Sequence, residues 1–485
     1  MNRKETGSNN QVLKYTGLFG GVQGINVLTS LVRTKFMALL LGPGGMGLAS
    51  LFYTTLQLLS QATSLGISTG AVREMSERYF TGQRELTAEF VKVVRAWSVL
   101  AALFGMLVCV AFGPLLSDIT FDWGDHTLHF ILLAPAIGMM AITAGETAIL
   151  KGQRKLAQVA LAQVMTAVAS IFIAVPTYYI YGEKGIVPVI VMMAFFTMCV
   201  TFCFSLSVFP LRMRGAIDLL VKGSEMVKLG VAFSMAGIVA CLTEVVVRSY
   251  LNVVGDLHLL GLFNAGYMII MTIGAVMFAS MDSDFFPRLS GLGFDPEAVK
   301  EIVDKQMKTA VLTLTPLMLA LIGLLPVVVP LFFSSQFAPV VPMAQVAALS
   351  MFFKAMTLPM AYITLAKGSS KCYFWLETTY YVVFVVLIVI GFHLWGLFGT
   401  GIAITVAHVF DFVMITIFVY KKYGFRMSKA VSRYAIVLSV LFALAYLTTI
   451  YLDGVLYGIA EVLIMLASFI YAVQNLKSSS TSTKL

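Results

Sequence analysis

Three basic residues occupy positions well inside long apolar segments of the chain: Arg33, Arg248 and Lys354. A charge near the centre of a bilayer costs roughly 3 to more than 10 kcal/mol, so such a side chain faces a partner or a water-filled cavity. The planar guanidinium group of arginine binds phosphate oxygens in bidentate fashion. We therefore predict that Arg33, Arg248 and Lys354 bind an anionic substrate.

An alternative stays open for Arg248, because Glu244 precedes it by four residues on the same helical face and can form an ion pair with it. Lys35 follows Arg33 by two residues, which places it about 200° around the helix. Arg33 and Lys35 therefore cannot face one cavity. We expect Lys35, which is closer to the outer surface, to extend its ammonium group there.

Three acids also lie within apolar segments: Glu244, Glu377 and Asp411. Each is a candidate for binding H⁺ or Na⁺ in a coupled transport cycle, and a structural ion pair or polar helix contact is the alternative for each. We expect four further acids near helix ends: Asp282, Asp284, Glu146 and Glu461.

The segment "DWGDHTLH" places Asp122, Asp125, His126 and His129 within eight residues. Metal ligands can have this spacing, but a short external connection without cysteine favours a solvated loop. The chain has no phosphate-binding loop, no Ser/His/Asp set and no HExxH motif. We therefore predict no catalytic residues, no metal and no cofactor beyond a coupling ion, and the protein is not expected to be an enzyme.

The composition of the chain indicates which kind of structural element holds these residues. The 485 residues are 59% hydrophobic and only 12% charged, with a mean hydropathy of +0.90. A soluble protein carries about twice this fraction of charge. Apolar windows of about 18 residues or more recur along the chain, which is typical of membrane-spanning helices. The five cysteines all lie in apolar segments, where we expect reduced packing residues. The chain is predicted to be an all-α polytopic membrane protein.

Gly, Pro and charge breaks divide the apolar windows into about 14 transmembrane helices. Their predicted ranges are 15–41, 47–70, 97–117, 128–150, 156–181, 185–210, 229–254, 260–286, 309–334, 340–366, 372–393, 396–420, 434–452 and 455–475. Two connections also read as amphipathic interfacial helices. One is "REMSERYFTGQRELTAEFVKVVRAW", and the other is "FDPEAVKEIVDKQMK", in which Asp295 is the predicted N-cap and Pro296 the first helical residue.

The 33 basic residues predict the orientation of these spans. The two tails and one set of alternate connections hold nearly all of them, whereas the opposite connections hold Lys184 alone. By the positive-inside rule, both termini are cytoplasmic. The net charge of +9 therefore reflects membrane orientation, and we expect no nucleic-acid partner.

A short pattern occurs twice. In "RTKFMALLLGPGGMGLASLFY" the pair Gly47-Leu48 is followed by a Tyr six residues after the glycine, and in "RSYLNVVGDLHLLGLFNAGY" Gly261-Leu262 has the same offset. This repeat predicts two six-helix lobes in the same orientation, an architecture typical of transporters. The predicted domains are 1–221 (helices 1–6), 222–430 (helices 7–12) and 431–485, with helices 13–14 and a cytoplasmic tail.

These segments resemble a known family. The late basic residues of the first span run into "LLLGPGGMGLASLFYTTLQLLSQATSLGISTGAVRE". The motif "VRSYLNVVGDLHLLGLFNAGYMI" opens the second half, and "FFPRLS" follows the eighth span. Over residues 10 to 425 the chain resembles the polysaccharide (O-antigen, lipid-linked oligosaccharide) flippases of the MOP superfamily. It departs from their pattern at Glu244, near where an Asp is expected.

The resemblance implies two MATE-like lobes around a V-shaped cavity that works by alternating access. The implied cargo is an undecaprenyl-diphosphate-linked oligosaccharide, moved from the cytoplasmic to the periplasmic leaflet of a bacterial inner membrane, among membrane lipids and other glycan-assembly proteins. Three alternatives stay open: a multidrug or cation antiporter of the same superfamily, a lipid II flippase, and a membrane glycan polymerase or ligase. Intramembrane basic residues weigh against the first, and short external connections weigh against the last.

Overall fold

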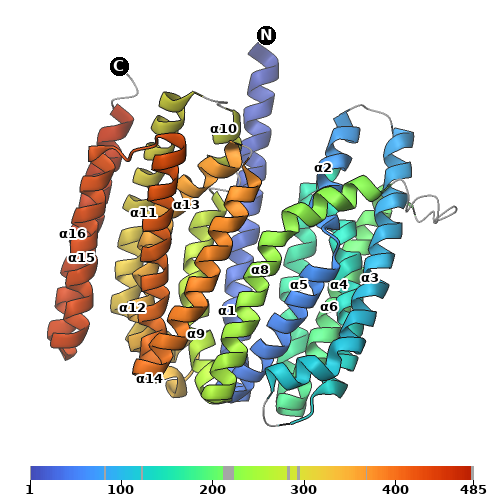
Figure 1. Cartoon of the computed structure of the whole chain (residues 1–485), viewed down its shortest axis with the longest axis horizontal. Coiled ribbons are helices and arrows are strands. Elements are labelled where there is room, and N and C mark those ends of the chain that lie inside the picture. The colour runs from blue at the N-terminus through green and yellow to red at the C-terminus, as the bar shows by residue number, and fades with distance from the viewer. Residues whose placement is uncertain are drawn as a thin grey trace. The chain divides into compact units, whose positions relative to one another are not determined.

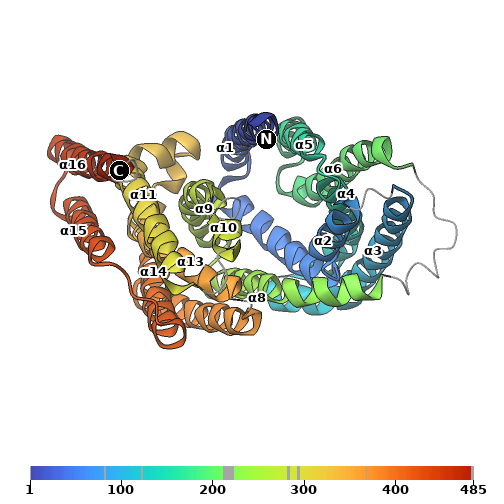
Figure 2. The same ribbon diagram turned by 90° about the horizontal axis from the view of Figure 1, so that it is seen from above.

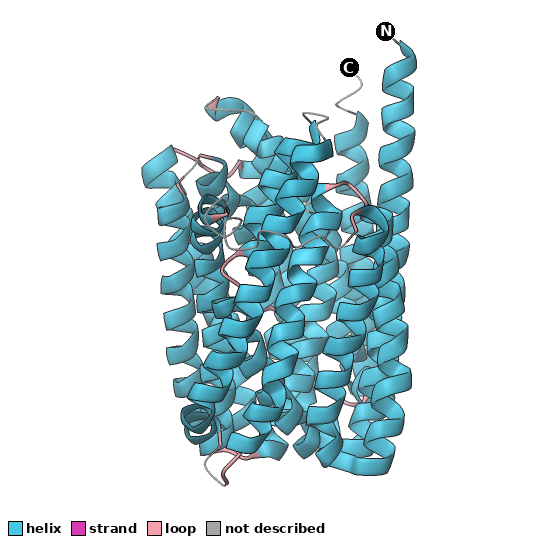
Figure 3. Cartoon of the chain, turned by 90° about the vertical axis from the view of Figure 1, so that its right-hand side faces the viewer, coloured by secondary structure: helices cyan, strands magenta, loops and turns pink. Residues whose placement is uncertain are grey.

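The structure is a computed structural model that describes residues 2–80, 84–121, 124–210, 223–280, 285–291, 295–367 and 369–481. Every regular element among these residues is a helix, joined to the next by short loops (Figure 3). The predicted all-α fold class is therefore confirmed. Tight packing divides the chain into two units, which we call unit 1 (Met1–Gly261) and unit 2 (Leu262–Leu485).

Unit 1 contains the helices of the first half of the chain. They are α1 (Asn2–Thr63), α2 (Ile67–Phe80), α3 (Arg84–Thr120), α4 (Thr127–Gly152), α5 (Leu156–Tyr181), η1 (Gly182–Gly185), α6 (Ile186–Val208), α8 (Ser224–Val254) and the start of α9 (Leu257–Ser280). Helix α8 packs against α1 and α2 within this unit. The predicted domain boundary at 221/222 follows from the repeat and stays a prediction.

Helix α1 is two spans joined by a sharp break. Gly42 has a φ of 63° and a ψ of −172°, and Pro43 follows it. Glycine adopts this conformation without steric cost, and proline cannot donate the next helical hydrogen bond. Figure 1 shows α1 running from the N-terminus to the opposite end of unit 1 and returning. The predicted external turn between the spans 15–41 and 47–70 lies at this break.

Unit 2 contains the remaining helices. They are the rest of α9, α10 (Phe286–Gly291), α11 (Pro296–Phe332), η3 (Ser335–Val340), α12 (Val341–Ala348), α13 (Ser350–Ala366), α14 (Ser370–Tyr423), α15 (Lys429–Tyr451) and α16 (Gly454–Thr481). Helices α12 and α13 are the most buried segment, and they pack against α11 and α14. Helices α15 and α16, predicted as an addition to the two lobes, pack against α11 (Figure 2).

Helix α14 has the same construction as α1. Trp395 and Gly396 leave helical geometry, and Gly396 has a φ of 56°. We call residues 370–394 the first arm of α14 and residues 397–423 its second arm. The backbones of Gly391 and Gly399 meet beside the turn, where a Cβ on Gly399 would overlap the carbonyl oxygen of Gly391. The two arms correspond to the predicted spans 372–393 and 396–420.

Each of the two predicted interfacial helices is joined, at its C-terminal end, to the membrane span that follows it. Asp295 caps α11 as predicted, its Oδ1 accepting from the backbone N–H groups of Glu297 (3.0 Å) and Ala298 (3.3 Å). The helix then continues into the predicted span 309–334 and ends at Phe332, because no Gly or Pro separates the amphipathic segment from the span. Similarly, α3 joins the second part of the first amphipathic segment to the predicted span 97–117.

Among the described residues, eleven helical segments are long and apolar enough to cross a membrane. Three of them contain 40 or 53 residues, whereas a bilayer needs about 20. Each of these three contains a glycine with positive φ: Gly42, Gly182 and Gly396. The number of fourteen crossings stays a prediction.

The two copies of the Gly-Leu repeat meet within unit 1. A Cβ on Gly47 would overlap the carbonyl oxygen of Leu257, and a Cβ on Gly261 would overlap that of Pro43. The turn of α1 and the start of α9 therefore approach each other backbone to backbone. The repeat marks this contact, which only glycine permits on either side.

We expect Gly261→Ala to lower the midpoint of thermal unfolding in detergent. Overpacking of this kind typically lowers the free energy of unfolding by about 1–3 kcal/mol. Gly44→Ala is the matched control in the same turn, because a Cβ there meets nothing within 4 Å. If both variants unfold at the wild-type temperature, the close contact of these backbones does not stabilise the protein.

Candidate functional site

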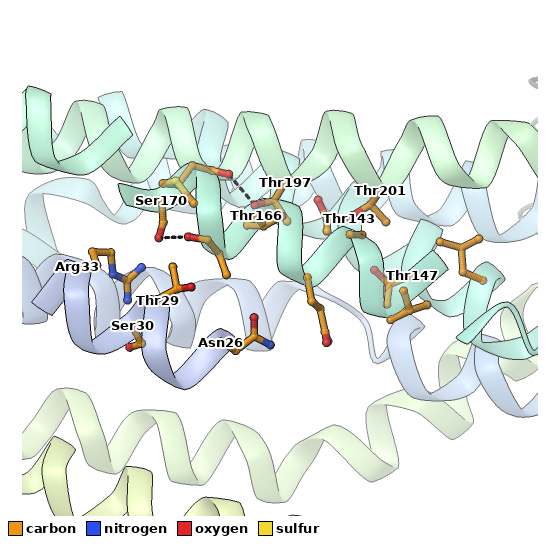
Figure 4. Close-up of a pocket in the computed structure, with 16 residues that line it drawn as sticks. Asn26, Thr29, Ser30, Arg33, Thr143, Thr147, Thr166, Ser170, Thr197 and Thr201 are labelled. Carbon is orange, nitrogen blue, oxygen red and sulfur yellow. Dashed lines mark hydrogen bonds between the residues drawn. The ribbon is translucent and has the colours of Figure 1, made fainter. Parts of the chain in front are cut away.

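A polar pocket of about 390 Å³ lies within unit 1, between α1, α4, α5 and α6 (Figure 4). Eleven of its 16 lining residues are polar: Asn26, Thr29, Ser30, Arg33, Thr143, Thr147, Gln163, Thr166, Ser170, Thr197 and Thr201. All of them belong to segments long and apolar enough to span a membrane. A polar cavity at this depth marks a path or a site for a polar ligand.

Arg33 is the only charged residue among the described residues that line this pocket. Its side chain is exposed and makes no hydrogen bond or ion pair with the described part of the chain. It lies nine residues before Gly42, about 13 Å along the helix axis at 1.5 Å per residue. Arg33 thus lines a cavity, and its binding of an anionic substrate stays a prediction.

Several of the hydroxyl groups around Arg33 already donate a hydrogen bond within their own helix. Thr29, Thr143, Ser170 and Thr197 each donate to a backbone carbonyl of their own helix, at 2.6 to 2.8 Å. Their hydrogens are therefore used, and their oxygens face the pocket as acceptors. The hydroxyl of Thr166 is buried with no hydrogen-bond partner among the described residues. The pocket combines one strong anion donor with a wall of acceptors.

Arg248 is not in this pocket. It is 8% exposed, and its Nη1 forms an ion pair with the Glu244 carboxylate four residues earlier. It also donates to the Glu244 carbonyl oxygen at 3.3 Å. The structure thus contains the ion pair that the spacing left open, and the lining of the pocket brings in Arg33 but not Arg248. Because Glu244 is engaged in the same pair, neither side chain is available as a bare charge.

Lys354, Glu377 and Asp411 come together inside unit 2. Lys354 lies on α13, and it interacts electrostatically with Glu377 on the first arm of α14 and Asp411 on the second. Its Nζ is 5.6 Å from the centre of the Phe278 ring, and no carboxylate among the described residues lies within 4 Å of it. Three residues that the sequence indicates separately therefore form one charge cluster.

Neutral polar groups surround this cluster. The Tyr373 hydroxyl hydrogen-bonds Glu377. His408 is 3% exposed, and its ring contacts the Ile404 carbonyl oxygen at 2.9 Å and the Tyr380 hydroxyl at 3.4 Å. With one ammonium and two carboxylates, the ionised cluster has a net charge of −1. One bound monovalent cation or proton would neutralise it.

The structure contains another ion pair, which is buried and which the sequence does not predict. The Arg95 guanidinium contacts both Glu146 carboxylate oxygens, at 2.8 and 3.2 Å, and the two side chains are 4% and 3% exposed. Arg95 also donates to the carbonyl oxygens of Phe209 and Pro210, at 3.1 Å each. The pair joins α3 and α4 to the end of α6, so its role is structural. Glu146, expected near a helix end, lies six residues before the end of α4 and is enclosed.

The surroundings of the remaining expected residues differ. Glu461, expected near a helix end, lies seven residues after the start of α16, is 5% exposed and accepts from the Thr448 hydroxyl of α15. Lys35 is half-buried. Asp122, Asp282 and Asp284 lie outside the described residues.

The segment predicted as a solvated loop is partly enclosed. His126 is 9% exposed, and its ring centre lies 4.2 Å from that of Phe121. Its Nδ1 is 3.3 Å from Nδ1 of His129. Burial lowers the pKa of His126, and the nearby His129 lowers it further. Aromatic packing explains the error: Phe121 of the same connection and Phe52 of α1, whose ring centre is 6.1 Å away, both pack against His126.

Comparison with solved structures identifies the fold. Lipid II flippase MurJ in an inward closed conformation matches with a TM-score of 0.72 and 14% identity, over 97% of this chain and 100% of that chain. An inward-facing multidrug resistance MATE transporter of the MOP superfamily matches with a TM-score of 0.62 and 14% identity, over 84% and 96%. The eukaryotic MATE transporter AtDTX14 matches with a TM-score of 0.56 and 17% identity, over 88% and 99%. The chain therefore has the fold that these three membrane proteins share.

The family follows from the sequence itself. A family model described as polysaccharide biosynthesis protein matches residues 36–342. Because this range covers more than half of the chain, the protein belongs to that family, and the predicted resemblance is confirmed. The comparison with curated proteins gives no match.

Proposed function

We propose that the protein is a flippase for an undecaprenyl-diphosphate-linked oligosaccharide, such as an O-antigen unit, and that it moves this lipid from the cytoplasmic to the periplasmic leaflet of a bacterial inner membrane. The observation that carries the proposal is the polar pocket around Arg33. Membership of the polysaccharide biosynthesis family and the transporter fold support it. Both termini are cytoplasmic in this proposal, and other glycan-assembly proteins supply and use the lipid.

The chemistry of the pocket matches the two polar parts of this cargo. A diphosphate consists of oxygen acceptors, which the Arg33 guanidinium can bind in bidentate fashion. Sugar hydroxyls are donors, and the threonine and serine oxygens that face the pocket are free to accept from them. The polyprenyl chain has no need of a polar site and stays in the bilayer.

The pocket weighs against one alternative, and the sequence weighs against another. A cation antiporter needs acidic groups around its substrate, and the described residues that line this pocket include no acid. A glycan polymerase or ligase needs nucleophilic or acid–base residues in an exposed site, which the sequence does not offer. A lipid II flippase carries a cargo with the same diphosphate, so experiment must separate it.

The separating experiment is depletion of the protein in its own host, followed by extraction of lipid-linked intermediates. We expect one undecaprenyl-diphosphate oligosaccharide to accumulate on the cytoplasmic side while surface polysaccharide disappears. Accumulation of lipid II with cell lysis would assign the lipid II alternative. Unchanged glycans with new sensitivity to cationic compounds would assign the drug exporter.

We further propose that the Lys354–Glu377–Asp411 cluster binds the coupling ion, H⁺ or Na⁺. Its net charge of −1 when ionised is costly in a membrane, and one monovalent cation removes that cost. Glu244, the third acid that the sequence suggests for this role, is already paired with Arg248. Of these candidate acids, Glu377 and Asp411 are therefore the two that share a single positive charge, that of Lys354.

Asp411→Asn should remove the dependence of transport on an imposed ion gradient, measured in proteoliposomes with a pH gradient or a Na⁺ gradient applied separately. The gradient that accelerates the wild type identifies the ion. Glu461→Gln is the control, because Glu461 is a buried acid of unit 2 outside the cluster. An Asp411→Asn protein that responds to the gradient as the wild type does would rule out the cluster as the coupling site.

A further inference from the structure

Unit 2 carries an open groove of about 550 Å³ along the second arm of α14. Its apolar walls are Leu376 of the first arm with Phe410, Val413, Met414, Ile417 and Phe418 of the second. Two lysines, Lys421 and Lys422, close one end. The groove lies outside both the Arg33 pocket and the Lys354 cluster.

The groove is on the outward face of its helix. Ile415 and Val419 of the second arm are 3% and 0% exposed, because that side packs inside unit 2, whereas Val413 and Ile417 are 47% and 50% exposed. All four residues belong to a segment apolar enough to span a membrane. The surroundings of the groove in a bilayer are therefore hydrocarbon chains, with which an acyl chain in the groove is continuous.

The dimensions and charge of the groove fit one lipid molecule. From residue 410 to residue 422 the helix rises about 18 Å at 1.5 Å per residue, close to half of a hydrocarbon core of about 30 Å. The groove thus spans about one leaflet, from the midplane to the head groups. The lysines are at the head-group end, and the described lining residues include no acid that would neutralise them.

The two lysines are positioned differently at this end. Lys422 Nζ donates to Cys372 Sγ of the first arm at 2.7 Å, which holds its ammonium across the mouth of the groove. Lys421 is exposed and extends from the same helical turn. Two ammonium groups at the end of an apolar groove are complementary to a phosphate that carries an acyl chain. Basic residues immediately cytoplasmic of a span recognise anionic lipids in this way.

We propose that this groove binds one anionic phospholipid, with an acyl chain along α14 and the head-group phosphate between Lys421 and Lys422. The charge distribution of the chain predicts that this end is cytoplasmic, so the lipid belongs to the inner leaflet. The proposal does not rest on the flippase function, because it concerns a bound lipid and not the cargo.

The test uses the purified full-length protein and native mass spectrometry, with phosphatidylglycerol and phosphatidylcholine of identical acyl chains as the two probes. We expect the wild type to bind phosphatidylglycerol in preference. The double variant K421Q/K422Q should lose that preference by about fivefold per lysine, roughly thirtyfold in all. K151Q/K155Q removes two exposed lysines from another connection and should bind as the wild type does.

A second variant tests the apolar part of the site. Val413→Trp fills the groove at an exposed position while retaining both lysines, and we expect it to weaken binding of phosphatidylglycerol. Equal binding of the two phospholipids by the wild type, or an unchanged preference in K421Q/K422Q, would overturn the proposal. Undecaprenyl phosphate that displaces phosphatidylglycerol at equal concentration would also overturn it, because the groove would then bind the carrier lipid instead.

Discussion

Arg33→Gln should abolish transport of the lipid-linked oligosaccharide while the protein still folds and inserts. Removing one partner of a desolvated, hydrogen-bonded charge pair costs about 2–5 kcal/mol, which corresponds to roughly thirtyfold or more in affinity. Arg33 makes no hydrogen bond or ion pair with the described residues, so its loss should have little effect on stability. Cells that depend on this variant should lose their surface polysaccharide.

Two further variants make this result specific. Arg33→Lys retains the charge but not the planar donor pair, and we expect intermediate transport. Lys35→Gln removes a neighbouring basic residue that does not line the pocket, so wild-type transport is expected. If both Arg33 variants restore the polysaccharide fully, Arg33 does not bind the cargo.

Arg95→Ala should have the largest effect on stability of any single change considered for this protein. It leaves the Glu146 carboxylate buried without its partner, and breaking a buried ion pair in this way costs about 3–5 kcal/mol. It also removes the donors to the carbonyl groups of Phe209 and Pro210 at the end of α6. We expect poor accumulation in the membrane and a large drop in the thermal unfolding midpoint in detergent.

The control is an ion pair that the structure leaves partly exposed. Glu74 and Arg78 are 2.7 Å apart, with side chains 29% and 36% exposed. Glu74→Ala should therefore cost at most about 1 kcal/mol, as exposed pairs do. The double variant R95M/E146L should recover much of the loss, because it replaces both charges with apolar side chains. Equal stability of Arg95→Ala and Glu74→Ala would show that the buried pair is not a stabilising contact.

The sequence predicts the helices well because their signals are local. The predicted span 156–181 has the bounds of α5, and the break after residue 41 coincides with Gly42, since glycine and proline act on their own turn. The cap at Asp295 is correct for the same reason. From the sequence we expected an interfacial helix and a separate span beginning at residue 309, whereas α11 joins the two. The charged residues between them suggested a break, but charge alone does not end a helix.

The sequence predicts a site residue only where the residue type is itself unusual for its segment. Arg33 and Lys354 are evident because a charge is rare in an apolar segment. The threonines around Arg33 are not, because such residues in spans bond to their own backbone wherever they face. The pairing of Arg95 with Glu146 joins residues 51 positions apart. It depends on how α3 packs against α4, which no local pattern specifies.

The most direct test of the Arg33 pocket is flipping in proteoliposomes that contain the purified protein and a labelled undecaprenyl-diphosphate oligosaccharide. A membrane-impermeant reagent that modifies only the outer sugars measures the fraction of lipid that changes leaflet. The wild type and Lys35→Gln should expose all of the lipid to the reagent, whereas Arg33→Gln should leave the inner half protected. If Arg33→Gln flips the lipid at the wild-type rate, the pocket around Arg33 is not the site through which the cargo passes.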